Sequence, residues 1–243
     1  MSALIDNLIN ENLVPLKPYE SARRLFSGGQ DWLNANESPY ANEYSVNSSN
    51  FNRYPSCQPE AVVSGYANYA GLDKSQLIVT RGADEGIELL VRTYCEPSKD
   101  SIALFLPTYG MYKVTADTHN VAINGLTQAL LLNGSVDEIV AAVGSSKLVF
   151  ICNPNNPTGS LTPLDKVKAI ATALAGKALV IVDEAYIEFC PEQSATQLIN
   201  EFSNIVVLRT LSKAFALAGL RTGFTLAQAS VLAPIRKVIA PYP

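Results

Sequence analysis

Lys213, Asp183 and Asn156 each follow a run of apolar residues that is typical of a buried strand. Lys213 comes shortly after "NIVVLRT", Asp183 ends "KALVIVD", and Asn156 lies in "NPNNPTG", which follows "KLVFIC". A lysine amine in an apolar pocket has a lowered pKa and becomes a nucleophile toward carbonyl groups. A buried carboxylate costs free energy unless a cation or a hydrogen-bond donor pairs with it. We therefore expect these side chains to meet a polar ligand where their strands end.

A phosphate group could bind close to Lys213. Ser212 and Arg221 flank the lysine in sequence and could hold a phosphate together. Gly82, Ala83 and Asp84 open a helical pattern directly after "QLIVT", and the free amides at a helix N-terminus attract anions. Alone, this second feature is equally well explained by a turn glycine and a helix-starting aspartate, and neither GxxxxGK[ST] nor GxGxxG is present.

Each of the other residues also has an ordinary structural explanation. Lys213 could lie on the surface, Asn156 could serve a rigid turn between two prolines, and Asp183 could cap a helix. Together with Tyr186 and the phosphate-binding candidates, however, they form the set that pyridoxal phosphate requires. That cofactor needs a lysine for a Schiff base, an acid beside its pyridinium nitrogen, and anchors for its phosphate.

The elements that would position these residues alternate between short β-branched runs and helical patterns. Most runs are continuously apolar, as expected for strands covered on both faces. They occupy residues 76–82, 101–107, 120–125, 147–153, 177–186, 204–210 and 220–227. The alternation predicts a doubly wound, mostly parallel sheet with ligands at the carboxyl ends of its strands. Residues 27–53, rich in Ser, Asn and Gly, are expected to form an irregular connection.

Two helices carry readable start signals. In "TPLDKVKAIATALAG" we expect Thr162 to be the N-cap, Pro163 to take the first helical position and Gly176 to end the helix. In "SVDEIVAAVG", Ser135 and Glu138 have the spacing of a capping box.

Composition excludes several other classes of function. A net charge of −4 and a pI near 5.1 argue against nucleic acid as the main partner. The N-terminal stretch lacks the basic region of a signal peptide, and no apolar run is long enough to cross a membrane, so we expect a cytoplasmic protein. The four cysteines are scattered, and His119 is the only histidine, so we expect free thiols and no metal site. His119 itself is expected to lie at a helix end.

Three motifs, in this order and spacing, resemble the fold-type I pyridoxal-phosphate aminotransferases: "NPNNPTG", "DEAY" and "TLSKAFALAGLRTGF". Further segments are similar to the histidinol-phosphate aminotransferase family, namely "PYESARR", "WLNANESP", "NRYPSCQP", "RGADEGIELLVR" and "PTYGMY". The resemblance runs along essentially the whole chain.

The resemblance implies a three-layer α/β/α large domain with a mostly parallel seven-stranded sheet, whose last strand, in residues 220–227, is antiparallel. Residues 1–40 would form an N-terminal arm and part of a small domain, and residues 41–243 the large domain that binds pyridoxal phosphate. Members of the family continue for roughly another hundred residues, the size of a small-domain fragment. We therefore expect a C-terminally truncated chain that lacks the rest of the small domain and the arginine that grips the substrate there.

The resemblance also implies roles for the residues that would hold the cofactor ring. Lys213 would bind the cofactor covalently and, once released, move a proton to and from the substrate carbon. Asp183 would stay ionised against the pyridine nitrogen. Asn156 and Tyr186 would donate hydrogen bonds to the cofactor's 3′-oxygen, and Tyr109 would stack on its ring.

Phosphate, partner and substrate contacts follow from the same resemblance. The phosphate would be bound by Gly82, Ala83, Asp84, Ser212 and Arg221. Tyr54 would reach the cofactor phosphate of a neighbouring subunit, which implies a homodimer. Tyr19 and Asn36 would line the substrate side, together with Tyr109 and Asn156.

The implied reaction transfers an amino group from glutamate to imidazole-acetol phosphate, giving histidinol phosphate and 2-oxoglutarate in L-histidine biosynthesis. A phospho-amino-acid decarboxylase or a C–S lyase would share the same cofactor residues. A truncated chain could instead bind the cofactor without turnover. A Rossmann-type dinucleotide binder is disfavoured, since no glycine fingerprint follows the first strand.

Overall fold

A seven-stranded sheet organises the computed structural model, which describes residues 7–20, 25 and 28–242. Its strands are β1 (Leu77–Thr80), β2 (Ser101–Leu106), β3 (Ala122–Thr127), β4 (Leu148–Cys152), β5 (Leu179–Asp183), β6 (Ile205–Thr210) and β7 (Gly223–Ala227). Their order is β1-β7-β6-β5-β4-β2-β3. Strands β3, β2, β4, β5 and β6 pair in parallel, and β7 is antiparallel to both of its neighbours. The predicted sheet, including its antiparallel last strand, is confirmed.

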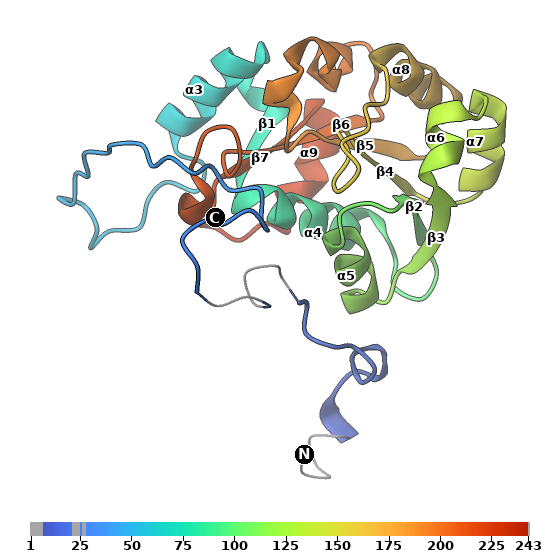
Figure 1. Ribbon diagram of the computed structural model, residues 1–243, viewed down its shortest axis with the longest axis horizontal. Coiled ribbons are helices and arrows are strands. Elements are labelled where there is room, and N and C mark those ends of the chain that lie inside the picture. The colour runs from blue at the N-terminus through green and yellow to red at the C-terminus, as the bar shows by residue number, and fades with distance from the viewer. Residues whose placement is uncertain (1–6, 21–24, 26–27, 243) are drawn as a thin grey trace.

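Helices cover both faces of this sheet and make the three layers (Figure 1). The helices are α3 (Glu60–Ala70), α4 (Gly82–Tyr94), α5 (Met111–Thr118), α6 (Gln128–Asn133), α7 (Val136–Val143), α8 (Leu164–Ala173) and α9 (Ala229–Ile235). One apolar cluster joins the sheet to α3, α6, α7 and α8, and a second joins its other face to α4, α5 and α9. Within β5, Val180 and Val182 belong to the first cluster and Ile181 to the second, which explains the continuously apolar strand sequences.

The capping signals were only partly correct. Ser135 and Glu138 form the expected capping box at the start of α7. Helix α8 begins at Leu164, with Pro163 and not Thr162 in the capping position. The backbone N–H of Leu164 donates to Oε1 of Gln193 at 3.1 Å, so a side chain distant in sequence satisfies the helix start. Thr162 is instead held by Asn153, which exchanges two hydrogen bonds with its backbone at 2.8 and 3.0 Å.

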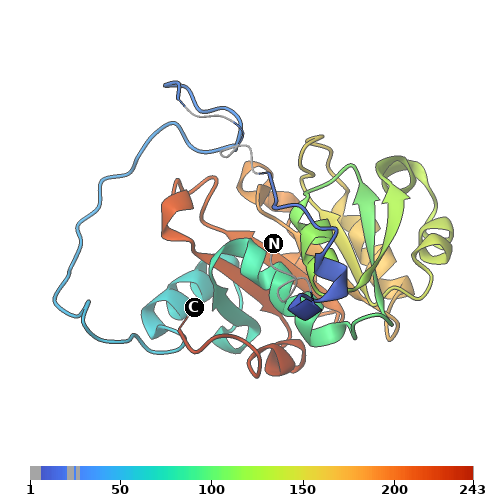
Figure 2. The same cartoon turned by 90° about the horizontal axis from the view of Figure 1, so that it is seen from below.

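Residues 28–58 contain neither helix nor strand, as expected for residues 28–53. Much of this segment arches away from the sheet before it joins α3 (Figure 2). Asn42 ties it to the loop after β6 by donating to the backbone oxygen of Phe215 at 3.0 Å. The segment therefore passes over the carboxyl edge of the sheet, where the candidate site lies.

His119 occupies the C-cap position of α5, where its ring nitrogen Nδ1 lies 3.0 Å from the backbone oxygen of Thr115, as the sequence predicted. Among the helices of the described residues, none combines the length and the hydrophobicity needed to cross a membrane.

Candidate active site

A cavity of about 620 Å³ opens at the carboxyl ends of β4, β5 and β6, beside the start of α4. Its walls include most of the residues singled out from the sequence: Tyr19, Asn36, Ala83, Asp84, Tyr109, Asn156, Asp183, Tyr186, Ser212, Lys213 and Arg221. These residues come from segments up to about two hundred positions apart, and the parallel strands bring them to one edge as the strand-end rule predicts.

Two predicted site residues do not line this cavity. Gly82 lies just outside it. A glycine is needed at this position because its φ is +75° and because an added Cβ would lie only 2.7 Å from Arg221 Nη2. Tyr54 is 81% exposed and stacks on Tyr242, with ring centroids 4.4 Å apart. The role predicted for Tyr54 concerns a second subunit, and it stays a prediction. Arg23 and Arg24 of "PYESARR" lie outside the described residues.

The Lys213 amine faces into the cavity from the loop after β6. Its Nζ donates to the backbone oxygen of Ala35 at 2.7 Å and lies 5.8 Å from the centre of the Tyr186 ring. Burial lowers the pKa of Lys213, and the nearby Glu37 and Asp84 carboxylates partly oppose this shift. A larger fraction of the amine is therefore neutral, and hence nucleophilic, than on an exposed lysine.

Asp183 lies at the end of β5 and is 2% exposed. Its Oδ2 accepts a hydrogen bond from the Tyr112 hydroxyl at 2.6 Å, and its Oδ1 accepts one from the Ala185 N–H at 3.2 Å. Burial raises the pKa of Asp183 to about 6, and the two hydrogen bonds only partly oppose this. Among the described residues, no lysine or arginine forms an ion pair with it.

Arg221, Ser212 and Thr210 gather at the other end of the cavity. Arg221 Nη1 donates to Ser212 Oγ at 3.3 Å, and the Thr210 hydroxyl donates to the same oxygen at 2.9 Å. Arg221 Nη2 contacts Asp84 Oδ2 at 3.4 Å. The N-terminus of α4 lies beside this group because Gly223 of β7 packs tightly on it, and an added Cβ there would come within 2.4 Å of Gly82. Cationic, hydroxyl and amide donors thus converge on one small region.

The middle of the cavity offers a flat aromatic surface and polar edges. Tyr109 donates to Asp84 Oδ1 at 2.9 Å, and Asn36 donates to the Tyr186 hydroxyl at 3.1 Å. A second hollow of about 800 Å³ continues from the cavity over Phe189 and shares with it Asn36, Asn156, Tyr186 and Lys213. The two hollows together have room for a ring-shaped cofactor and a small substrate beside it.

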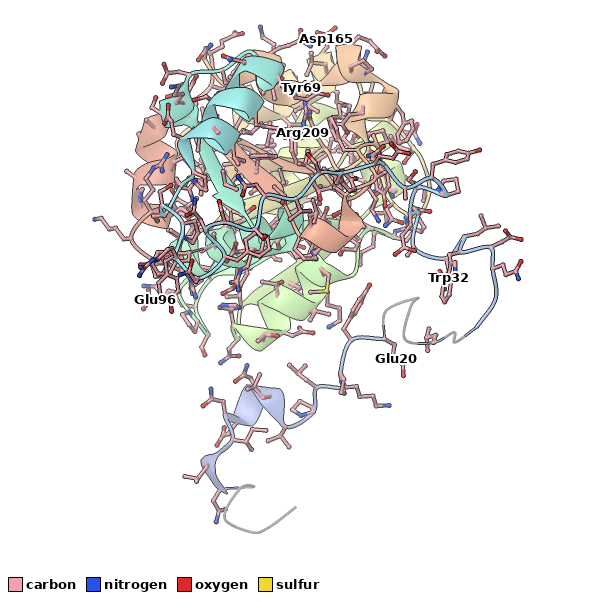
Figure 3. All side chains as sticks on the ribbon, turned by 90° about the vertical axis from the view of Figure 1, so that its left-hand side faces the viewer. Glu20, Trp32, Tyr69, Glu96, Asp165 and Arg209 are labelled. Atoms are coloured by element: carbon pink, nitrogen blue, oxygen red, sulfur yellow. The ribbon has the colours of Figure 1, made fainter. Side chains whose placement is uncertain are left out.

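A second buried acid, Glu184, follows Asp183 directly and lies on the opposite side of β5, away from the cavity. It is fully buried, and its Oε2 accepts from Arg209 Nε at 2.7 Å. The guanidinium also binds Glu188 Oε1 at 3.1 Å and Ser194 Oγ at 2.9 Å. Arg209 is thus enclosed within the protein, with Tyr69 of α3 nearby (Figure 3). Both carboxylate oxygens of Glu184 thus have partners within the protein, whereas Glu188 Oε2 is buried with no hydrogen-bond partner among the described residues.

A family model, described as aminotransferase class I and II, matches residues 29–243. The chain belongs to the class I and II aminotransferases. It is 55% identical to a histidinol-phosphate aminotransferase of Pseudoalteromonas atlantica over 99% of its own length and 66% of the relative's. It is also 51% identical to the histidinol-phosphate aminotransferase of Pectobacterium atrosepticum, over 98% of this chain and 67% of that one. The chain therefore spans about two thirds of the length of these aminotransferases.

Solved aminotransferase structures share its fold. The histidinol-phosphate aminotransferase of Sinorhizobium meliloti, solved in complex with pyridoxal-5′-phosphate, matches with a TM-score of 0.71 and 27% identity. The match covers 78% of this chain and 52% of that one. The expected fold-type I architecture is confirmed for the region that the chain contains.

Several residues of this candidate site could not be assigned a role from the sequence. Tyr112, which binds Asp183, is fully buried, and its sequence pattern is that of an ordinary core residue of an amphipathic helix. Thr210 begins the motif "TLSKAFALAGLRTGF" but has no role of its own in the prediction, and Ala35 contributes a backbone oxygen that no side-chain motif can indicate. A tyrosine on the buried face of a helix next to a predicted ligand loop is the one signal that could have pointed to Tyr112.

Proposed function

We propose that this chain binds pyridoxal phosphate in the cavity and that the protein uses it for amino transfer. The observation that carries the proposal is the arrangement of a half-buried lysine amine and a buried, cation-free carboxylate on one cavity, with an Arg221–Ser212 pair that could bind an anion on the same cavity. Membership of the aminotransferase family and the likeness to a relative solved with this cofactor support it.

The residues present fit this cofactor. Asp183 has no positively charged partner among the described residues, and a protonated pyridine nitrogen would supply one. Arg221, Ser212 and the start of α4 would hold the dianionic phosphate, since arginine and helix N-termini both favour such anions. When bound, pyridoxal phosphate supplies an electron sink that stabilises negative charge on the substrate carbon.

The protein's own groups would then orient and transfer protons. Lys213, with its lowered pKa, is suited to bind the cofactor aldehyde covalently and afterwards to accept a proton at Nζ. Asn156 and Tyr186 would hydrogen-bond the cofactor's 3′-oxygen, and Tyr109 would stack on the ring. Tyr19 and Asn36 line the same cavity and would contact the substrate.

The proposed substrates are glutamate and imidazole-acetol phosphate, which would give 2-oxoglutarate and histidinol phosphate in L-histidine biosynthesis. The support is the identity of 50% or more to aminotransferases named for this reaction. We further propose that residues 41–243 form the cofactor domain, that residues 1–40 belong to an arm and a small domain, and that Tyr54 contacts the cofactor of a second copy in a homodimer. The proposed compartment is the cytoplasm, where free thiols such as these stay reduced.

The test is to add pyridoxal phosphate to the purified chain, record its visible spectrum, reduce with borohydride and map the modified lysine. We expect a shifted absorbance band and a single label on Lys213. Lys213→Arg keeps the positive charge and should abolish the label, whereas Lys177→Arg, at an exposed position, should leave it intact. Labels spread over surface lysines would contradict the cofactor site.

The reaction class is tested separately by adding glutamate to the loaded chain. Formation of 2-oxoglutarate, with loss of the absorbance band, is the result expected of an aminotransferase. Release of carbon dioxide from a phosphorylated amino acid would instead indicate a decarboxylase on the same cofactor residues. A stable band with no exchange would mean that the chain binds the cofactor without turnover.

A further inference from the structure

Tyr112 is a fully buried group that contacts a residue of the proposed cofactor site and has no role assigned to it so far. It lies in the first turn of α5 and is fully buried, and its hydroxyl donates to Asp183 Oδ2 at 2.6 Å. This is a side chain to side chain hydrogen bond between elements 71 residues apart in sequence. A polar contact of this kind, enclosed in an apolar layer, is costly to break because the Asp183 carboxylate would then keep only the Ala185 N–H as a donor.

The ring of Tyr112 is held so that its hydroxyl cannot turn away. It stacks on Phe150 of β4 with centroids 4.8 Å apart and an interplanar angle of 26°. On another side it meets the edge of Tyr109, at 5.6 Å and 88°. Both arrangements are favourable aromatic geometries, and together they fix the ring relative to β4 and to the loop before α5. The hydroxyl is therefore preorganised toward the Asp183 carboxylate.

The other titratable groups that face Asp183 do not stabilise its negative charge. Burial raises the pKa of the Cys152 thiol on β4 to about 12, and burial also raises the pKa of Tyr109 and of Tyr186. These three groups are therefore neutral at physiological pH. Asp84 on α4 carries the same charge as Asp183 and raises the pKa of that carboxyl further.

Only two hydrogen-bond donors offset this environment among the described residues: the Tyr112 hydroxyl and the Ala185 N–H. The hydroxyl makes the shorter bond, 2.6 Å against 3.2 Å. Burial raises the pKa of Tyr112 well above its ordinary value, so the phenol keeps its proton and remains a donor. A donor to an ionised carboxylate favours the charged form and lowers its pKa.

We propose that Tyr112 is a positioning residue, which fixes Asp183 and keeps its carboxylate ionised so that it can pair with a cationic ring nitrogen. The second half of this statement rests on the proposed cofactor. The first half concerns only two side chains of this protein and can be tested without any ligand.

The test compares Tyr112→Phe with Tyr94→Phe in the cofactor-free chain. Both changes remove one tyrosine hydroxyl and keep the ring. Tyr94 is a matched control because its hydroxyl also makes a 2.6 Å hydrogen bond, but to the backbone oxygen of Val231, away from the cavity. Carbon-13 NMR of labelled aspartate side chains, with Asp183→Asn to assign the signal, gives the pKa of Asp183 in each variant. We expect Tyr112→Phe to raise it by about one unit, and Tyr94→Phe to leave it unchanged.

Cofactor affinity supplies the second readout. In Tyr112→Phe, pyridoxal phosphate should bind several-fold more weakly than to the wild type near pH 6.5, and the difference should shrink as pH rises above the new pKa of Asp183. An unchanged pKa in Tyr112→Phe, or an equal shift in Tyr94→Phe, would overturn the proposal. If wild-type chain binds no cofactor at all, the proposed function fails, and the NMR titration still decides the role of Tyr112.

A third variant guards against misfolding of Tyr112→Phe. Phe150→Leu keeps the hydroxyl but removes the ring on which Tyr112 stacks. It should raise the pKa of Asp183 in the same direction by a smaller amount. No shift in Phe150→Leu, with Tyr112→Phe unfolded, would count against the proposal, because the orientation of the ring would then not matter.

Discussion

Asp183 and Glu184 are consecutive acids at the end of one strand, and both are buried, yet their surroundings differ. Glu184 faces Arg209, Ser194 and the Ala195 N–H, so its charge has a cation and two further donors within 3.0 Å. Asp183 faces the cavity and has two neutral donors. The alternation of side chains along a strand sends the two carboxylates to opposite faces of the sheet.

The presence or absence of a cationic partner distinguishes an acid that stabilises the fold from one that is expected to pair with a ligand. An arginine partner offsets much of the free-energy cost of burying a carboxylate. A buried carboxylate without a cation keeps that cost until a cationic ligand binds. Burial raises the pKa of both carboxyls, that of Asp183 to about 6, so the missing cationic partner and not the direction of the shift distinguishes Asp183. Burial alone would not make the distinction, because both side chains are almost completely buried, but Asp183 lines the cavity and Glu184 does not.

The largest effect on stability should come from the cation of the Glu184 cluster. Arg209→Met would leave Glu184 and Glu188 buried without their shared partner, and breaking such a pair costs about 3–5 kcal/mol. Urea unfolding of the cofactor-free chain measures this. Arg92→Met, which removes a partly exposed ion pair with Glu88, should cost less than about 1 kcal/mol. Equal losses in both variants would show that the buried cluster is not a major source of stability.

Whereas Arg209→Met is expected to reduce stability, Asp183→Asn should weaken cofactor binding without reducing stability. It removes the charge that would pair with the cofactor's ring nitrogen, and we expect pyridoxal phosphate to bind on the order of a hundredfold more weakly. The cofactor-free chain should be no less stable than wild type, because a neutral amide is cheaper to bury than an unpaired carboxylate. Absorbance titration and urea unfolding give the two values. A loss of stability as large as that of Arg209→Met would mean that Asp183 is a structural acid after all.

The pH dependence of the free energy of unfolding tests whether Asp183 lacks a cationic partner. Because the folded-state pKa of Asp183 is raised to about 6, the folded chain holds this proton more tightly than the unfolded chain does. The associated stability is complete below about pH 4 and is lost as pH rises through about 6, a change on the order of 3 kcal/mol. Subtracting the Asp183→Asn profile from the wild-type profile removes the contributions of Glu184 and Glu188. A flat difference between pH 4 and pH 7 would contradict the assigned pKa.

How far the sequence could predict this arrangement depends on the range of the interactions. The strands follow from continuous apolar runs, and the Ser135 capping box from a spacing of three residues, so both could be read locally. The start of α8 could not, because its donor is satisfied by Gln193, 29 residues away. The motif "DEAY" likewise does not tell which acid is paired, since Arg209 lies 25 residues beyond Glu184.

In the candidate site, too, contacts between residues distant in sequence could not be predicted. Family motifs identified Lys213, Asp183 and Arg221, all of which line the cavity. The sequence does not reveal the role of Tyr112, because a buried tyrosine on a helix is typical of a core and only the three-dimensional structure brings its hydroxyl to Asp183.

Two serines allow the Glu184 cluster and the cavity to be compared by single hydroxyl groups, for which we expect the smallest effects. Ser194 accepts from Arg209 Nη2 at 2.9 Å and donates to Glu184 at 3.0 Å, whereas Ser212 lies in the cavity and accepts from Thr210 and Arg221. Ser194→Ala should cost about 1–3 kcal/mol of stability, since it leaves buried charged groups with one partner fewer, and should not change cofactor affinity.

Ser212→Ala should mainly reduce cofactor affinity and not stability. It should weaken pyridoxal phosphate binding by about tenfold, the equivalent of roughly 1.4 kcal/mol. The stability of the cofactor-free chain should fall by no more than about 1 kcal/mol, because both donors to Ser212 line the cavity. Each serine is thus the control for the other, measured by the same urea unfolding and absorbance titrations. If both variants lost stability and affinity together, the Glu184 cluster and the cavity would be coupled, and the separation between a structural acid and a ligand-binding acid would not hold.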